Sequence, residues 1–87
     1  MYYVYVIKNE RDEFYIGYSA NLKKRLADHN AGGTQSTKIH QWELVYYEAY
    51  LSEQYARERE QTLKKNRRMK TFLMERVKES LSYLVVR

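Results

Sequence analysis

Two tyrosine-rich segments near the start of the chain constrain its fold more than any other feature. Residues 2–8 and 13–19 each alternate aromatic and β-branched side chains, as β-strands do, and only a short polar stretch separates them. A connection this short joins antiparallel neighbours, so the sequence predicts a β-hairpin. If residue i pairs with residue 20−i, Tyr5 and Tyr15 face each other on one side of the sheet.

A helix is predicted directly after the hairpin. Ser19 or Asn21 can cap its first turn, and the helix runs to about Asn30, where Gly32-Gly33 provides the stop. Residues 33–41 are polar and lack the hydrophobic spacing of any regular element, so we expect a loop that faces the substrate.

One further strand and two further helices complete the predicted order β-β-α-β-α-α, in the α+β class. Residues 42–51, WELVYYEAYL, predict the third strand, and Ser52 can cap a second helix that reaches about Asn66. Apolar residues spaced along 69–81 predict a third, amphipathic helix, and residues 83–87 form either a short strand or a frayed end. With 87 residues, we expect one domain over residues 1–87.

The composition narrows the functional classes. The chain has no cysteine, which excludes disulfides and thiolate zinc sites, and no run approaches the ~20 apolar residues of a membrane span. We therefore expect a cytoplasmic protein that does not bind membranes. The formal net charge is +5, and residues 64–70, KKNRRMK, hold five cations without an acid. That cluster predicts either a contact with a phosphate backbone or a solvated junction between two helices.

Polar side chains are predicted on inward faces of the first and second helices. Arg25 and His29 share a helical stripe with Leu22, so a cation and an imidazole point toward the sheet. A buried structural histidine is the plain alternative for His29, whereas an inward arginine needs an anionic partner, permanent or visiting. Glu60 lies on the inward stripe of the second helix, and it must either pair with a cation such as Arg25 or bind a divalent ion.

These residues together resemble the GIY-YIG nuclease superfamily, and the chain is similar to a small stand-alone version of the catalytic module of the repair nuclease excinuclease C. The similarity covers residues 2 to about 66. Tyr3-Val4-Tyr5 lies at the first motif, with tyrosine in place of the glycine of its name, and Tyr15-Ile16-Gly17 is the second motif unaltered. Residues 21–30 carry the family arginine and histidine, and residues 60–65 resemble the metal-binding segment.

The resemblance implies a three-stranded antiparallel sheet flanked by helices and hydrolysis of a nucleic-acid phosphodiester with one Mg²⁺ or Mn²⁺ ion. In that scheme Tyr15 activates or positions the attacking water, and Tyr5 assists it by hydrogen bonding. Arg25 stabilises the charge on the phosphate, His29 is an auxiliary base or a support for Arg25, and Glu60 holds the metal ion. The remaining expected substrate-binding residues are Gly17, Lys38, Lys64, Lys65, Arg67 and Arg68.

The expected substrate is DNA rather than RNA, in DNA repair or processing, with a protein partner supplying specificity because the chain has no room for a separate binding module. Two other readings stay open at this point. The same fold could serve as a non-catalytic nucleic-acid-binding or partner-docking module. The tyrosine-rich surface could instead mediate protein interactions.

Overall fold

The computed structural model describes residues 1–32 and 40–86, and its elements follow the predicted order. They are β1 (Tyr2–Lys8), β2 (Phe14–Ser19), α1 (Leu22–Asn30), β3 (Glu43–Tyr50), α2 (Glu53–Lys65) and α3 (Arg67–Val86). Asn21 caps α1 and Ser52 caps α2, each by accepting a hydrogen bond from a backbone N–H of the first turn. The alternative of a strand near the end of the chain is wrong, because α3 continues to Val86.

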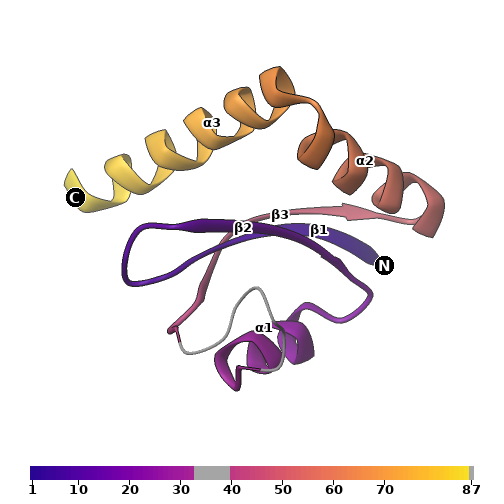
Figure 1. The fold of residues 1–87 in the computed structure, drawn as a ribbon, viewed down its shortest axis with the longest axis horizontal. Helices are drawn as coiled ribbons and strands as arrows, with labels where there is room; N and C mark the ends of the chain where they lie inside the picture. Colours follow the sequence, from indigo (N-terminus) through magenta and orange to yellow (C-terminus); the bar gives the residue numbers. More distant parts are fainter. Residues whose placement is uncertain (33–39, 87) are drawn as a thin grey trace.

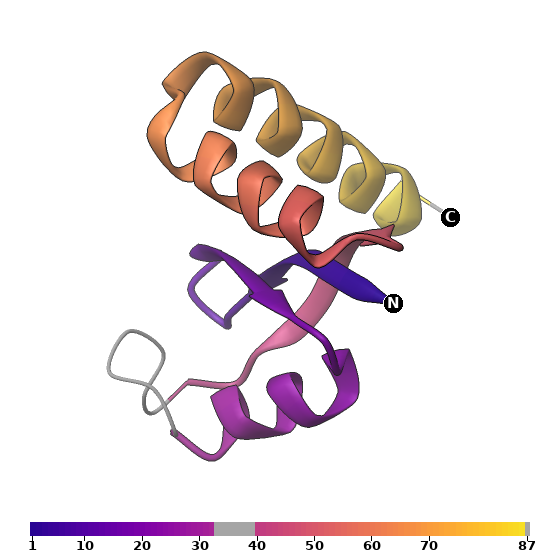
Figure 2. The ribbon, with the colours of Figure 1, turned by 90° about the vertical axis from the view of Figure 1, so that its right-hand side faces the viewer.

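Strand β1 lies at the centre of the sheet, between β2 and β3, and both pairings are antiparallel. Figure 1 shows α1 below the sheet and the α2–α3 pair above it. Figure 2 shows α2 and α3 side by side, each lying across the same face. None of the helices in the described part of the chain is both long and apolar enough to cross a membrane.

The hairpin register differs by two residues from the predicted one. Tyr5 pairs with Gly17 and Ile7 pairs with Tyr15, so the partners sum to 22 rather than 20. The longer loop is built by Asn9, whose Oδ1 accepts hydrogen bonds from the backbone N–H groups of residues 11 and 13 at 2.9 and 3.0 Å. Because side chains alternate between faces, an even shift keeps Tyr5 and Tyr15 on the same face as diagonal neighbours.

The core on the α2–α3 side of the sheet is apolar. Strand β1 contributes Val4 and Val6, and α2 contributes Ala56 and Leu63, all of which are fully buried. Residues from β2 and α3 complete this cluster, namely Ile16, Leu73 and Val77. The close fit of small and branched side chains explains why two helices can share one face of so narrow a sheet.

The opposite face is aromatic and polar. Tyr5, Ile7 and Trp42 are buried there, against Leu22 and Leu26 of α1. Trp42, which was predicted to begin the third strand, lies just before β3. The Asn30 side chain holds its backbone by donating to the Trp42 carbonyl at 3.0 Å and accepting from the Trp42 N–H at 2.6 Å. The end of α1 is thereby joined to the start of β3.

Candidate active site

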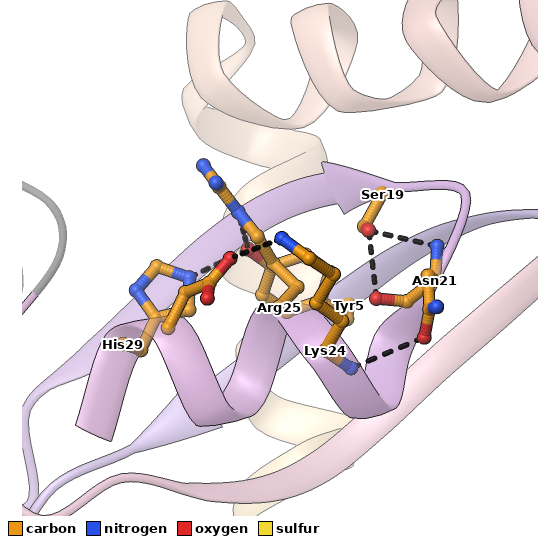
Figure 3. A network of polar contacts seen from close by, with 7 residues as sticks. Tyr5, Ser19, Asn21, Lys24, Arg25 and His29 are labelled. Atoms are coloured by element: carbon orange, nitrogen blue, oxygen red, sulfur yellow. Dashed lines mark hydrogen bonds and ion pairs between the residues drawn. The ribbon is translucent and has the colours of Figure 1, made fainter. Parts of the chain in front are cut away.

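The polar side chains predicted on the inner face of α1 do point toward the sheet. His29 is completely buried, and Arg25 is half-buried one turn before it. The start of the helix is held by Asn21, whose Oδ1 accepts from the Lys24 N–H at 3.1 Å, and by Ser19 (Figure 3). These caps place both functional side chains against the motif tyrosines.

Tyr5, His29 and Arg25 form one hydrogen-bonded group (Figure 3). The Tyr5 hydroxyl lies 2.7 Å from His29 Nε2, and Arg25 Nε donates to the same hydroxyl at 3.4 Å. An arginine can only donate, so the Tyr5 oxygen accepts that bond and its own proton is left for Nε2 of a neutral His29. Tyr5 is 1% exposed and His29 is fully buried, so the contact between them is shielded from solvent.

Burial sets the protonation states of this group. It raises the pKa of Tyr5, although the Arg25 hydrogen bond and charge act in the opposite direction. It lowers the pKa of His29, and the Arg25 charge lowers it further. Tyr5 is therefore a neutral phenol at neutral pH, suited to hydrogen bonding rather than to accepting a proton.

Gly17 is required by the Tyr5 ring. A Cβ added at Gly17 would collide with the Oη and Cζ atoms of Tyr5, because the end of the ring lies over its partner residue on β2. The close approach at Gly17 is thus made by a side chain of the same sheet. The motif glycine on one strand and the motif tyrosine on the other act as a pair.

Tyr15 is the more accessible of the two motif tyrosines. Its ring makes edge contacts with His29 and Trp42, at centroid distances of 5.1 and 6.4 Å. The ring is half-buried, and its hydroxyl has no hydrogen-bond partner among the described residues. This phenol is open to water or to a substrate, which Tyr5 is not.

Glu60 pairs with a different cation from the one proposed from the sequence. Its Oε2 lies 3.2 Å from Nζ of Lys64, one turn further along α2, and not beside Arg25. Its side chain is 17% exposed, between the fully buried Ala56 and Leu63 on the same stripe. The Lys64 ammonium also lies 5.4 Å from the centre of the Tyr15 ring. This contact brings Glu60 and Tyr15 into one neighbourhood across the β2 edge.

Arg25 keeps its charge without a carboxylate partner. Within residues 1–32 and 40–86, no acidic group lies within ion-pair distance of its guanidinium, and its only hydrogen bond is the one to Tyr5. That bond raises the pKa of Arg25, so the side chain remains a cation. A half-buried cation with no carboxylate in ion-pair contact among the described residues is suited to bind a visiting anion.

The donors near Glu60 fit a hydrated Mg²⁺ or Mn²⁺ ion better than a metal held by protein groups alone. No group of three histidine, aspartate or glutamate side chains could hold a metal in the described part of the chain. Glu60 supplies one carboxylate, and Mg²⁺ commonly takes its other ligands from water and phosphate. The residues present therefore fit an ion that is completed by the substrate.

The predicted basic cluster divides at the junction of α2 and α3. Lys64 turns toward Tyr15 and Glu60, whereas Lys65 and Arg67 line a shallow groove of about 620 Å³ together with Gln61, Thr62 and Asn66. Arg68 is exposed on the first turn of α3. Lys38 lies outside the described residues.

One polar network was missed at the sequence level. Glu48 of β3 accepts hydrogen bonds from the hydroxyls of Tyr46 and Tyr50 and pairs with Arg59 of α2 at 2.9 and 3.0 Å. The three hydrogen-bonding partners lower the pKa of Glu48 against the effect of its burial, which raises it. Alternation of Tyr46, Glu48 and Tyr50 along one strand face was an available signal. The arginine partner was not predictable from spacing within β3.

Comparisons with known proteins show the family of the chain. A family model described as the GIY-YIG catalytic domain matches residues 1–72. The UPF0213 protein SH2523 of Staphylococcus haemolyticus is 40% identical over 65 residues, which cover 72% of this chain and 79% of that protein. The UPF0213 protein SpyM50708 of Streptococcus pyogenes serotype M5 is 40% identical over 67 residues, which cover 75% and 73%. These names state no activity, and no solved structure gave a significant match.

Proposed function

The chain belongs to the GIY-YIG nuclease domain family, and from this premise we propose that it is a metal-dependent endonuclease that hydrolyses phosphodiester bonds of DNA. The single observation that carries the proposal is Arg25. It is a half-buried cation, hydrogen-bonded to a motif tyrosine and without an acidic partner in the described residues, which suits it to a phosphate. Membership of this family implies a nucleic-acid substrate, and the resemblance to an excision-repair module supports DNA repair or processing as the setting.

The two motif tyrosines, Tyr5 and Tyr15, have different roles because their hydroxyls have different surroundings. Tyr15, with its open hydroxyl, positions the attacking water beside the phosphorus atom. Tyr5 is held between His29 and Arg25, so it fixes the orientation of the arginine rather than touching water. The remaining guanidinium nitrogens of Arg25 donate to the phosphate oxygens, where negative charge increases as the water attacks and the leaving oxygen departs.

Glu60 would hold the divalent ion. When bound, Mg²⁺ or Mn²⁺ supplies Lewis-acid stabilisation of the phosphate and of the leaving oxygen. The contact between Lys64 and both Glu60 and Tyr15 supports this assignment, because it puts the carboxylate near the phenol that positions the water.

The test is cleavage of supercoiled plasmid and of branched or flapped DNA with Mg²⁺, Mn²⁺ or EDTA. We expect nicking that EDTA abolishes, and losses of about 10²-fold or more in Tyr15→Phe, Arg25→Ala and Glu60→Gln. Tyr47→Phe and Glu58→Gln are matched controls, because Tyr47 is an exposed strand tyrosine and Glu58 an exposed acid of the same helix. The controls should cleave like the wild type.

Equal cleavage by Glu60→Gln and the wild type would reject the metal assignment. Binding without cleavage by every purified form, including the wild type with Mn²⁺, would reject the enzymatic proposal in favour of a binding module. Binding should decline steeply with salt in either case, because phosphate contacts release counterions.

A further inference from the structure

Lys64 occupies the space between the candidate metal ligand and the candidate water-positioning tyrosine. Its ammonium lies 3.2 Å from Glu60 Oε2 and 5.4 Å from the centre of the Tyr15 ring. The spacing of four residues on α2, with the acid first, is the favourable orientation for such a pair. Both interactions are made by one positive charge.

A divalent ion and this ammonium have the same requirement. Each needs the Glu60 carboxylate, and two cations at one oxygen repel each other strongly. No cluster of three acidic or histidine side chains in the described residues offers the ion another place. Occupancy of Glu60 by Lys64 therefore opposes its occupancy by a metal ion.

We propose that Lys64 is a built-in counter-ion of Glu60 that a divalent metal must displace, so that it weakens metal binding until a phosphate draws the ammonium away. This inference rests on the proposed function, since it takes Glu60 as the metal ligand. Lys64 acts through Glu60 and is a positioning residue. Its side chain is 44% exposed on a flexible stem, so the ammonium is able to leave the carboxylate for a phosphate bound beside Tyr15.

A regulatory consequence follows from linkage between the two binding events. If nucleic acid takes the ammonium, the carboxylate becomes available and metal affinity rises; by the same coupling, metal raises affinity for nucleic acid. The metal would then load mainly in the presence of substrate. Metal binding to the enzyme without nucleic acid would be weak.

The experiment measures Mn²⁺ affinity without nucleic acid, from the electron paramagnetic resonance signal of free Mn²⁺ at low salt. We expect Lys64→Gln to bind Mn²⁺ about three- to tenfold more tightly than the wild type. Lys64→Arg should keep the wild-type affinity, because a guanidinium can still pair with Glu60. Lys65→Gln is the matched control for loss of one charge, since Lys65 is exposed and faces the groove instead. Circular dichroism melting curves verify folding.

Each outcome decides the proposal. If Lys64 has only a structural role, its replacement leaves the Mn²⁺ affinity unchanged or lowers it. Either result with Lys64→Gln overturns the inference. If Lys65→Gln raises the Mn²⁺ affinity as much as Lys64→Gln does, the effect is one of net charge, and the inference is again overturned. If Glu60→Gln loses Mn²⁺ while Lys64→Gln equals the wild type, only the role of Lys64 fails. If Glu60→Gln binds Mn²⁺ like the wild type, the metal assignment in the proposed function fails with it.

Discussion

Strand β1 presents Val4 and Val6 to helices α2 and α3, and Tyr5 and Ile7 to helix α1. The first face is closed mainly by apolar side chains from α2 and α3, with the ion pair of Glu48 and Arg59 beside them. The second face is closed by a helix whose inward residues include a buried imidazole and a half-buried guanidinium. The same strand thus separates a mainly apolar core from a layer in which the motif tyrosines meet His29 and Arg25.

The two layers differ in what holds them. A buried Leu or Val side chain stabilises the α2–α3 side by about 1.5–3 kcal/mol through removal of apolar surface from water. On the α1 side, each hydrogen bond adds only about 1 kcal/mol, but a broken one leaves a buried polar group unsatisfied. The stability of the first layer should depend mainly on apolar packing, whereas that of the second should depend on polar geometry as well.

The largest predicted effect on stability is on the apolar face. Leu63→Ala removes a fully buried side chain between α2 and the sheet, and we expect the free energy of unfolding to fall by about 3 kcal/mol. Urea denaturation monitored by circular dichroism measures this. At a temperature where the variant remains folded, its cleavage per folded molecule should match the wild type. A selective loss of cleavage would show that the two layers are not separable.

A smaller effect is predicted on the chemical face. Gly17→Ala forces the added methyl group against the Tyr5 ring, and we expect a loss of about 2 kcal/mol of stability together with a disproportionate loss of cleavage. In a Tyr5→Leu background the ring is gone, so the same substitution should cost much less. Strictly additive losses in the double variant would contradict the assigned collision.

The smallest predicted effect is a pH dependence confined to the α1 side. Because burial and Arg25 lower the pKa of His29 below its ordinary value of 6.5, the unfolded chain takes up this proton before the folded one does. The free energy of unfolding should therefore fall as the pH is lowered through 6.5 toward the lower pKa of His29 in the folded protein. Unfolding curves of the wild type and His29→Gln between pH 7.5 and about 5 should diverge in that window. Parallel profiles would show that His29 accepts its proton at no cost.

Sequence patterns predicted the elements well because local signals define them. The caps at Asn21 and Ser52 and the inward stripe of α1 depend on spacing alone. The hairpin register was wrong because Asn9 folds a longer loop, with Asp12 at a positive φ of 60°, and pattern alternation is unchanged by a shift of two.

The contacts of the candidate site were only partly predictable. The inward direction of Arg25 and Glu60 followed from helical periodicity, but the alternative in which Glu60 pairs with Arg25 was wrong. Residue spacing did point to the observed partner, since Lys64 follows Glu60 by one turn. Choosing between these cations requires knowing that α2 and α1 lie on opposite faces of the sheet, which is a property of the tertiary structure (Figure 2).

The bond between Tyr5 and His29 has a consequence for how such chains diverge. It joins α1 to the central strand, so a descendant that had stopped cutting nucleic acid would still need this tyrosine and this histidine to keep its shape. Tyr15 and Arg25 make fewer contacts that hold the fold. The Tyr15 hydroxyl has no hydrogen-bond partner and Arg25 forms no ion pair among the described residues. Retention of Tyr5 and His29 alone would show that the fold is inherited, whereas retention of Tyr15 and Arg25 as well would indicate that the proposed activity is inherited with it.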